Sequence, residues 1–200
     1  MIKGMVSCVV MLVLAGCSYS YQEEGSFFHR QGPSISIDKI ESDVNTTMQR
    51  SLAKELASNA YYRYTPSGGR YTLKVKRLEE DHERIGFRYD RDNAKGTLEK
   101  NLLGVEDRHF IVVEVSLLDS YSQKVISGPH KVSASVDYDY TDPGSPRDLI
   151  FAKREPVMQF SLGQLDSYEG AYDSSTPILY RNLAKKIVAG LNRIQPDISS

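Results

Sequence analysis

The chain has 200 residues, 40% of them hydrophobic, which is enough for one compact domain. Its 25 Lys and Arg nearly balance its 26 Asp and Glu, and the formal net charge of −1 argues against nucleic-acid binding, since such domains are usually strongly basic. The sequence contains no glycine-rich phosphate loop, no Gly-x-Ser-x-Gly turn and no His-Glu-x-x-His pair. We therefore expect neither an enzyme nor a cofactor-binding protein.

The first sixteen residues have the features of a secretory signal. Met1–Lys3 supplies a positive start, Val6–Leu14 is apolar, and small residues precede Cys17. The apolar run is shorter than the roughly 18–20 residues that a membrane-spanning helix needs. We predict that residues 1–16 are removed as a signal peptide. Removal discards Cys8, which leaves Cys17 without a cysteine partner for a disulfide.

The segment Leu14-Ala15-Gly16-Cys17 resembles the lipobox of bacterial lipoproteins. The resemblance implies that Cys17 becomes the first mature residue and carries acyl chains, palmitate among them, on its sulfur and its amine. Several chains together would give stable membrane attachment. Ser18 stands where an Asp would retain an enterobacterial lipoprotein in the inner membrane, which favours the outer membrane. The alternative is an ordinary signal peptide followed by an incidental cysteine.

The mature chain is predicted to begin with a tether and to continue as one domain. Residues 17–33 are polar and aromatic and form the lipidated tether, and residues 34–196 form a single α+β domain. Alternating apolar and polar residues over 34–40 predict a half-buried strand. Apolar residues at every fourth position over 44–60 predict an amphipathic helix, and residues 61–65 a short edge strand.

The middle of the domain is predicted to consist of antiparallel strands. Alternation over 71–89 indicates one long strand with a solvated or bulged middle. A long loop, 90–108, connects it to a β-branched strand over 110–118. After a turn, Val125-Ile126 is predicted to begin another strand, which Gly128-Pro129 interrupts, and residues 132–140 beyond it alternate cleanly.

The last part of the domain gives weaker signals until its final helix. Residues 141–175 contain several Pro and Gly, and we expect there a short helix from Arg147 and a strand over 157–162. The final helix is predicted to start with Pro177 at its first position and to end before Pro196. Its expected cap is Ser175 or Thr176.

Two amphipathic helices and a set of antiparallel strands predict the fold class. Both helices would cover one face of the sheet, because each has one apolar stripe to bury. The expected architecture is an α+β two-layer sandwich with a mainly antiparallel sheet.

The densest polar cluster covers residues 79–84. On a strand, alternate side chains point to opposite faces, so Glu80, His82 and Arg84 would lie on one face and Glu79, Asp81 and Glu83 on the other. We interpret the cluster as a solvated strand face rather than a metal site, and expect no metal. Single histidines occur elsewhere and are expected at the surface or in caps, namely His29, His109 and His130.

Cations and aromatic residues are interleaved around the end of the predicted hairpin. The cations are Arg84, Arg88, Arg91, Lys95, Lys100 and Arg108, and the aromatic residues are Phe87 and Tyr89. Such a mixture suits an amphiphile with phosphates and acyl chains, because Arg contacts phosphate oxygens in pairs. Acidic residues lie among them, so an ordinary solvated loop is the alternative.

The mature chain resembles the LptE family of lipopolysaccharide-assembly lipoproteins of the outer membrane. The resemblance is carried by the lipobox at 14–17, the strand at 34–40 with its helix residues Met48, Leu52 and Leu56, the strand pair at 71–89 and 110–119, and the late helix at 180–187. It implies an α+β sandwich that plugs the β-barrel of a partner, LptD, helps that barrel to assemble, and binds lipopolysaccharide through basic loop residues.

The candidates for lipopolysaccharide binding come from local chemistry and are Arg88, Arg91 and Lys95. Residues 141–175 are longer than the corresponding connection in the family. Two alternatives stay open. One is a lipoprotein subunit of another cell-envelope transport complex, and the other is a surface-exposed lipoprotein that binds a ligand.

Overall fold

The computed structural model of the chain describes residues 32–41, 43–91, 97–141, 149–152, 155–158 and 167–194. The predicted signal peptide, Cys17 and nearly all of the tether lie outside these ranges. Neither helix of the described part is long and apolar enough to cross a membrane.

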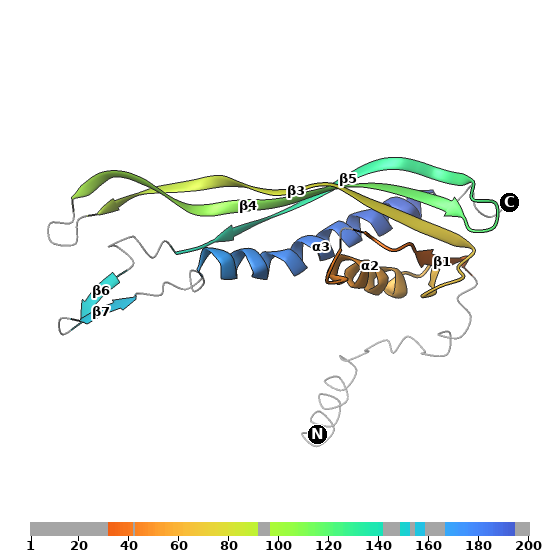
Figure 1. Cartoon of the computed structure of the whole chain (residues 1–200), viewed down its shortest axis with the longest axis horizontal. Helices are drawn as coiled ribbons and strands as arrows, with labels where there is room; N and C mark the ends of the chain where they lie inside the picture. The colour runs from red at the N-terminus through yellow and green to blue at the C-terminus, as the bar shows by residue number, and fades with distance from the viewer. Residues whose placement is uncertain are drawn as a thin grey trace, which may run out of the picture. The chain divides into compact units, whose positions relative to one another are not determined.

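One five-stranded sheet forms the centre of the domain, in the order β2-β1-β3-β4-β5 (Figure 1). The first strand pairs in parallel with both of its neighbours, whereas the remaining pairs are antiparallel. The strands are β1 (Ser34–Ile37), β2 (Arg63–Tyr64), β3 (Tyr71–Arg91), β4 (Leu98–Asp119) and β5 (Val125–Asp139). The prediction of a mainly antiparallel α+β fold is confirmed.

Two helices, α2 (Thr47–Ser58) and α3 (Tyr168–Arg193), lie on the same face of the sheet (Figure 1). Helix α2 buries Met48, Leu52 and Leu56, the stripe that the four-residue spacing predicts. The sheet meets the helices with alternate residues of each strand, which are nearly inaccessible to solvent: Ile35, Leu73, Val75, Ile111, Val113 and Leu117.

A β-bulge in β3 reverses which residues face the helices. Arg77 pairs with Val113, but Glu79 already pairs with Val112, so Leu78 is an additional residue. Odd-numbered residues face the helices before the bulge, as Leu73 and Val75 do. After the bulge Glu80, opposite the buried Ile111, takes that orientation. The predicted bulged middle of this strand is therefore present.

Helix α3 begins at Tyr168, nine residues before Pro177, so the predicted start and cap are wrong. Ser167 is the N-cap, and its hydroxyl accepts a hydrogen bond from the Gly170 N–H at 3.2 Å. A proline inside a helix costs about 3 kcal/mol because it removes a backbone hydrogen bond. The helix nevertheless continues through Pro177, and Ala171 and Ser175 in its first turns are buried, which local sequence cannot reveal.

Three further expectations differ from the structure. The predicted loop over 90–108 is mostly strand, because β4 begins at Leu98 and pairs with β3 up to Arg91. Strand β5 runs through Gly128-Pro129, where a register shift opposite Val115–Leu117 accommodates Gly128 at a φ of 100°. The short helix predicted from Arg147 is absent from the part that is described, which instead contains a two-stranded sheet of β6 (Leu149–Ala152) and β7 (Glu155–Met158).

Burial of the apolar stripe of α3 should dominate the stability of the domain. Leu183 is 0% exposed and Ile178, on the same helix, is 40% exposed. We expect Leu183→Ala to lower the free energy of unfolding by about 2–5 kcal/mol, because it leaves a cavity. The matched control Ile178→Ala should cost below about 1 kcal/mol in urea denaturation. Equal losses would mean that α3 is not packed on the sheet as described.

Candidate functional site

The β3-β4 hairpin continues beyond its neighbour as a two-stranded ribbon. Strand β5 ends with Asp139 opposite Glu106, whereas β3 and β4 stay paired from Phe87 and Gly104 out to Arg91 and Leu98. We call residues 86–91 and 98–104 the distal arm. Figure 1 shows the hairpin extending past the start of α3. Part of the sequence expected as a loop is therefore an ordered extension of the sheet.

One face of the distal arm is apolar and exposed. Phe87 and Tyr89 are two residues apart, and Leu102 lies directly opposite Tyr89, so their side chains share a face. Their exposed fractions are 53%, 54% and 58%, and Leu98 is 60% exposed. Large apolar side chains grouped in this way are typical of a surface that contacts protein or lipid.

Sequence analysis missed Leu98 and Leu102 because both fell in the predicted loop. No alternation marks them in the sequence, because three polar residues, 99–101, separate Leu98 from Leu102.

The three predicted lipopolysaccharide-binding residues lie on the arm or next to it. Arg88 is partly buried and, by strand alternation, lies on the face opposite Phe87 and Tyr89, as does the fully buried Asp90. Arg91 is the last residue of β3, and nothing is described of its side chain. Lys95 and the lipidation candidate Cys17 lie outside the described residues.

A buried carboxylate joins the distal arm to the rest of the sheet. The Asp107 side chain is 1% exposed, accepts a hydrogen bond from the Tyr140 hydroxyl at 3.0 Å and lies 3.6 Å from Arg84 Nε. Burial, together with the bond to Asp107, raises the pKa of Tyr140 to about 12. Gly104 lies against the Arg84 side chain, which would have to move to admit a Cβ at this position. Arg84 is thus paired with a buried carboxylate, while its side chain stays 53% exposed.

Aromatic rings surround this junction from the side of α3. Tyr138 and Tyr140 of the sheet contact Tyr168 of the helix, with ring centroids 6.3 and 4.9 Å apart. His82 also meets Tyr168, at 5.9 Å and edge to face. These contacts hold the first turns of α3 where the arm leaves the sheet.

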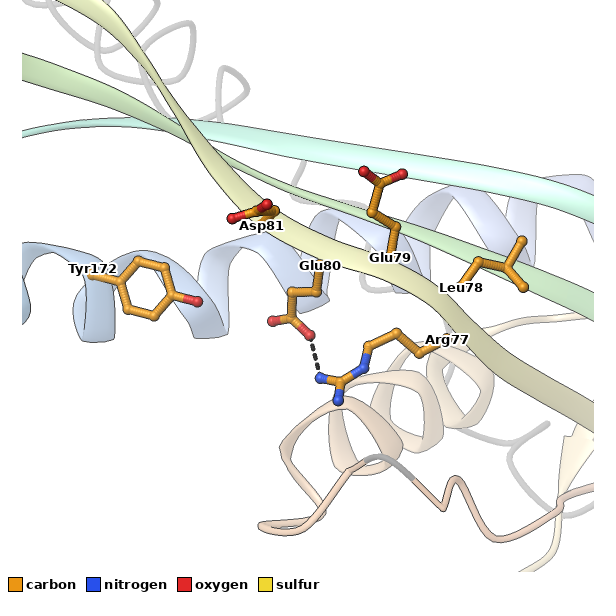
Figure 2. Close-up of a pocket in the computed structure, with 6 residues that line it drawn as sticks. All are labelled: Arg77, Leu78, Glu79, Glu80, Asp81 and Tyr172. Carbon is orange, nitrogen blue, oxygen red and sulfur yellow. Dashed lines mark hydrogen bonds and ion pairs between the residues drawn. The ribbon is translucent and has the colours of Figure 1, made fainter.

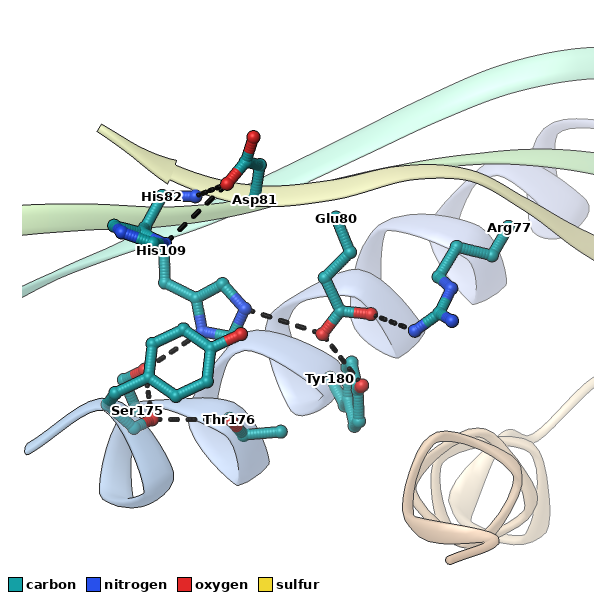
Figure 3. Close-up of polar contacts among 9 residues, drawn as sticks. Arg77, Glu80, Asp81, His82, His109, Ser175, Thr176 and Tyr180 are labelled. Carbon is teal, nitrogen blue, oxygen red and sulfur yellow. Dashed lines mark hydrogen bonds and ion pairs between the residues drawn. The ribbon is translucent and has the colours of Figure 1, made fainter. Parts of the chain in front are cut away.

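A line of polar groups continues from the junction along α3, and we call Arg77, Glu80, His109, Ser175 and Tyr180 the polar seam (Figure 3). All of them except Arg77 are largely buried. His109 is 0% exposed, with Nδ1 2.9 Å from Ser175 Oγ and Nε2 3.3 Å from Glu80 Oε1. The expectation of a surface or capping histidine is therefore wrong for His109. His109 pairs with His82 across β3 and β4, and this cross-strand register cannot be predicted from the sequence alone.

The Glu80 carboxylate is the centre of the polar seam. It accepts hydrogen bonds from Arg77 at 2.6 Å and from the Tyr180 hydroxyl at 2.8 Å. Burial alone would raise the pKa of Glu80, but the contacts with His109, Arg77 and Tyr180 outweigh it and lower the pKa to about 2. The prediction of a solvated face is wrong for Glu80, whose side chain is 10% exposed, whereas residues 79 and 81–84 are exposed as predicted.

An open pocket of about 470 Å³ lies beside the polar seam, lined by Arg77, Leu78, Glu79, Glu80, Asp81 and Tyr172 (Figure 2). Figure 2 shows Glu80 and Arg77 directed toward one another and Glu79 projecting to the other side of β3. Because Glu80 forms an ion pair with Arg77, these two pocket-lining side chains bind each other. Within the described ranges no three His, Cys, Asp or Glu residues gather as metal ligands.

No family model and no curated protein matches this chain. Among solved structures, the minor lipoprotein from Acinetobacter baumannii is 15% identical with a TM-score of 0.44, over 80% of this chain and 94% of that one. Rare lipoprotein B from Shewanella oneidensis is 12% identical with a TM-score of 0.46, over 84% and 99%. A Xanthomonas campestris protein of the DUF330 family is 10% identical with a TM-score of 0.46, over 84% and 89%.

The polar seam should make stability depend on pH through Glu80. Its pKa is lower in the folded protein than the ordinary value of 4.5, so its contribution is complete above pH 4.5 and is lost as pH falls toward about 2. We expect Glu80→Gln to lower stability at pH 7 by about 2–3 kcal/mol. Thermal melts followed by circular dichroism should show the stability difference between the wild type and Glu80→Gln shrinking as pH falls from 4.5 toward about 2.

The exposed neighbour Glu79 is the matched control, and Glu79→Gln should leave stability nearly unchanged at every pH. A stability difference between the wild type and Glu80→Gln that stays constant from pH 7 to pH 2 would contradict the assignment. It would indicate a packing effect rather than an effect of the Glu80 charge.

Proposed function

We propose that this chain is an outer-membrane lipoprotein that plugs and stabilises a β-barrel lipopolysaccharide translocon and assists lipopolysaccharide assembly at the cell surface. The lipobox supplies the anchor at Cys17, and the resemblance to the LptE family supplies the partner, an LptD-like barrel. The distal arm occupies the lumen of the barrel, and the end of the sheet that follows the tether stays at its periplasmic rim.

The observation that carries this proposal is the exposed apolar face of the distal arm. An isolated two-stranded ribbon is only marginally stable in water, and exposing apolar side chains on it to water costs further free energy. Phe87, Tyr89, Leu98 and Leu102 would be covered if the arm lay inside a barrel or against acyl chains. A barrel that passes an amphiphile provides both kinds of surface around one ribbon.

Lipopolysaccharide itself is the second partner of the arm in this proposal. Its acyl chains suit the apolar face, and its phosphates suit cations at the tip, where Arg91 ends β3 and Lys95 follows. Lys100 is exposed on β4. Arg88 also belongs to the candidate set, although its partly buried position makes it less accessible.

Affinity purification of the lipidated protein from detergent-solubilised envelopes tests the plug function. We expect a large β-barrel protein in near-stoichiometric amount. The double variant Tyr89→Ser/Leu102→Ser should retain about a tenth of it or less, because it removes two central apolar contacts. The control Val44→Ser changes a 90% exposed residue outside the arm and should retain the partner.

Other outcomes distinguish the alternatives. Recovery of a different envelope machine with no barrel would identify a subunit of another transport complex. Loss of the protein on protease treatment of intact cells would identify a surface-exposed lipoprotein. Either result, or unchanged surface lipopolysaccharide after depletion, would contradict the plug function.

Direct lipopolysaccharide binding should depend on the cations at the tip. We expect Arg91→Gln/Lys95→Gln to weaken binding of fluorescent lipopolysaccharide about tenfold at low salt, with a smaller effect at high salt. The control Lys54→Gln/Lys185→Gln removes equal charge from exposed positions on the helices. Equal weakening in both variants would assign the effect to net charge and contradict a site at the tip.

A further inference from the structure

The end of the sheet opposite the distal arm gathers several segments around the start of the domain. The Arg70 N–H donates to Ser34 Oγ at 2.9 Å, and the Ser120 N–H donates to the Arg70 carbonyl at 2.9 Å. The Arg63 N–H donates to the Pro33 carbonyl at 3.2 Å. We call residues 32–34, 61–63, 70–71 and 119–126 the proximal end. Figure 1 shows the β4-β5 turn and the starts of β1 and β3 at this end.

The proximal end carries large apolar side chains that the core does not use. Tyr121, in the turn between β4 and β5, is 87% exposed. Val125 and Ile126 follow it at 48% and 40%, and Tyr61 on the other edge of the sheet is 50% exposed. Tyrosine at the margin of an apolar patch is typical of the interface between a membrane and water.

The charge of the proximal end is positive. Arg63, Arg70 and Lys124 are exposed, and Asp119 is the only acidic residue in the ranges that define this end. Asp119 Oδ1 accepts hydrogen bonds from the backbone N–H groups of Tyr121 and Ser122, at 3.0 and 2.8 Å. Asp119 also interacts electrostatically with Arg70, and the three cations leave this end with a net excess of positive charge.

The length of the tether limits where this end can lie. Fifteen residue steps separate Cys17 from Gly32, a span of at most about 50 Å. Strand β3 has 21 residues and is about 70 Å long, so the tip of the arm is farther from the tether than the tether is long. An anchored Cys17 therefore keeps the proximal end within about 50 Å of the bilayer, a limit that does not hold for the tip of the arm.

We propose that the proximal end is a membrane-contact surface that docks on the phospholipid leaflet holding the acylated Cys17. The cations meet lipid phosphates, the tyrosines lie at headgroup depth, and Val125 and Ile126 contact the acyl boundary. This inference rests on the lipid anchor of the proposed function and adds an orientation, with the distal arm directed away from that leaflet.

Site-specific quenching tests the orientation in the lipidated protein. Because Cys17 carries lipid, Ser122→Cys in the turn or Lys100→Cys on the arm gives one labelling site for a fluorophore. The protein is placed in vesicles of phosphatidylethanolamine and phosphatidylglycerol that contain a nitroxide-labelled lipid. We expect quenching several-fold stronger at residue 122 than at residue 100.

A second pair of variants separates docking from anchoring. Tyr121→Ser/Ile126→Ser, made in the Ser122→Cys protein, should lower quenching by about half while the acyl chains keep the protein on floating vesicles. The control Val44→Ser should leave quenching unchanged. Equal or absent quenching at both labelled sites, in a protein that floats, overturns this proposal alone. A protein that does not float overturns the lipid anchor and this proposal with it.

Discussion

The additional residue at Leu78 is the constraint on which the arrangement of the site depends. Without it, Glu80 would face solvent and Glu79 would face α3, because side chains alternate along a strand. With it, Glu80 accepts hydrogen bonds from Arg77 and Tyr180 and lies 3.3 Å from His109. This buried carboxylate is costly to desolvate, and its several partners repay the cost. The polar seam therefore defines where α3 lies under the sheet, and it does so next to the point where the distal arm leaves.

The same sheet has two ends of different character, separated by this packed middle. The distal arm is a two-stranded ribbon with Phe87, Tyr89 and Leu102 on one face. The proximal end combines exposed tyrosines with cations and follows directly from the tether. A long hairpin whose middle is held by α3 keeps these ends about 70 Å apart. In the proposed function this separation lets one chain be anchored at a leaflet and still place an apolar arm inside a barrel.

Much of the candidate site was visible in the sequence, although its arrangement was not. Phe87, Tyr89 and the neighbouring cations were recognised as a group suited to an amphiphile. Strand pairing then separated them, because Arg88 lies on the face opposite Phe87 and Arg84 is bound to Asp107. Leu98 and Leu102 join the group through cross-strand register, which depends on two segments at once. The burial of His109 depends on tertiary contacts in the same way, since its partners Glu80 and Ser175 are distant in the chain.

The sequence by itself determined the class of fold, because two-residue and four-residue periodicities follow from the geometry of a single strand or helix. It also contained the signal and lipobox on which the predicted acylation of Cys17 rests. Only the tertiary structure decided where α3 begins, how far β4 extends and which polar residues are buried. Those features arise from contacts between segments far apart in the chain, whose packing energy outweighs local preferences such as that of Pro177 for a helix start.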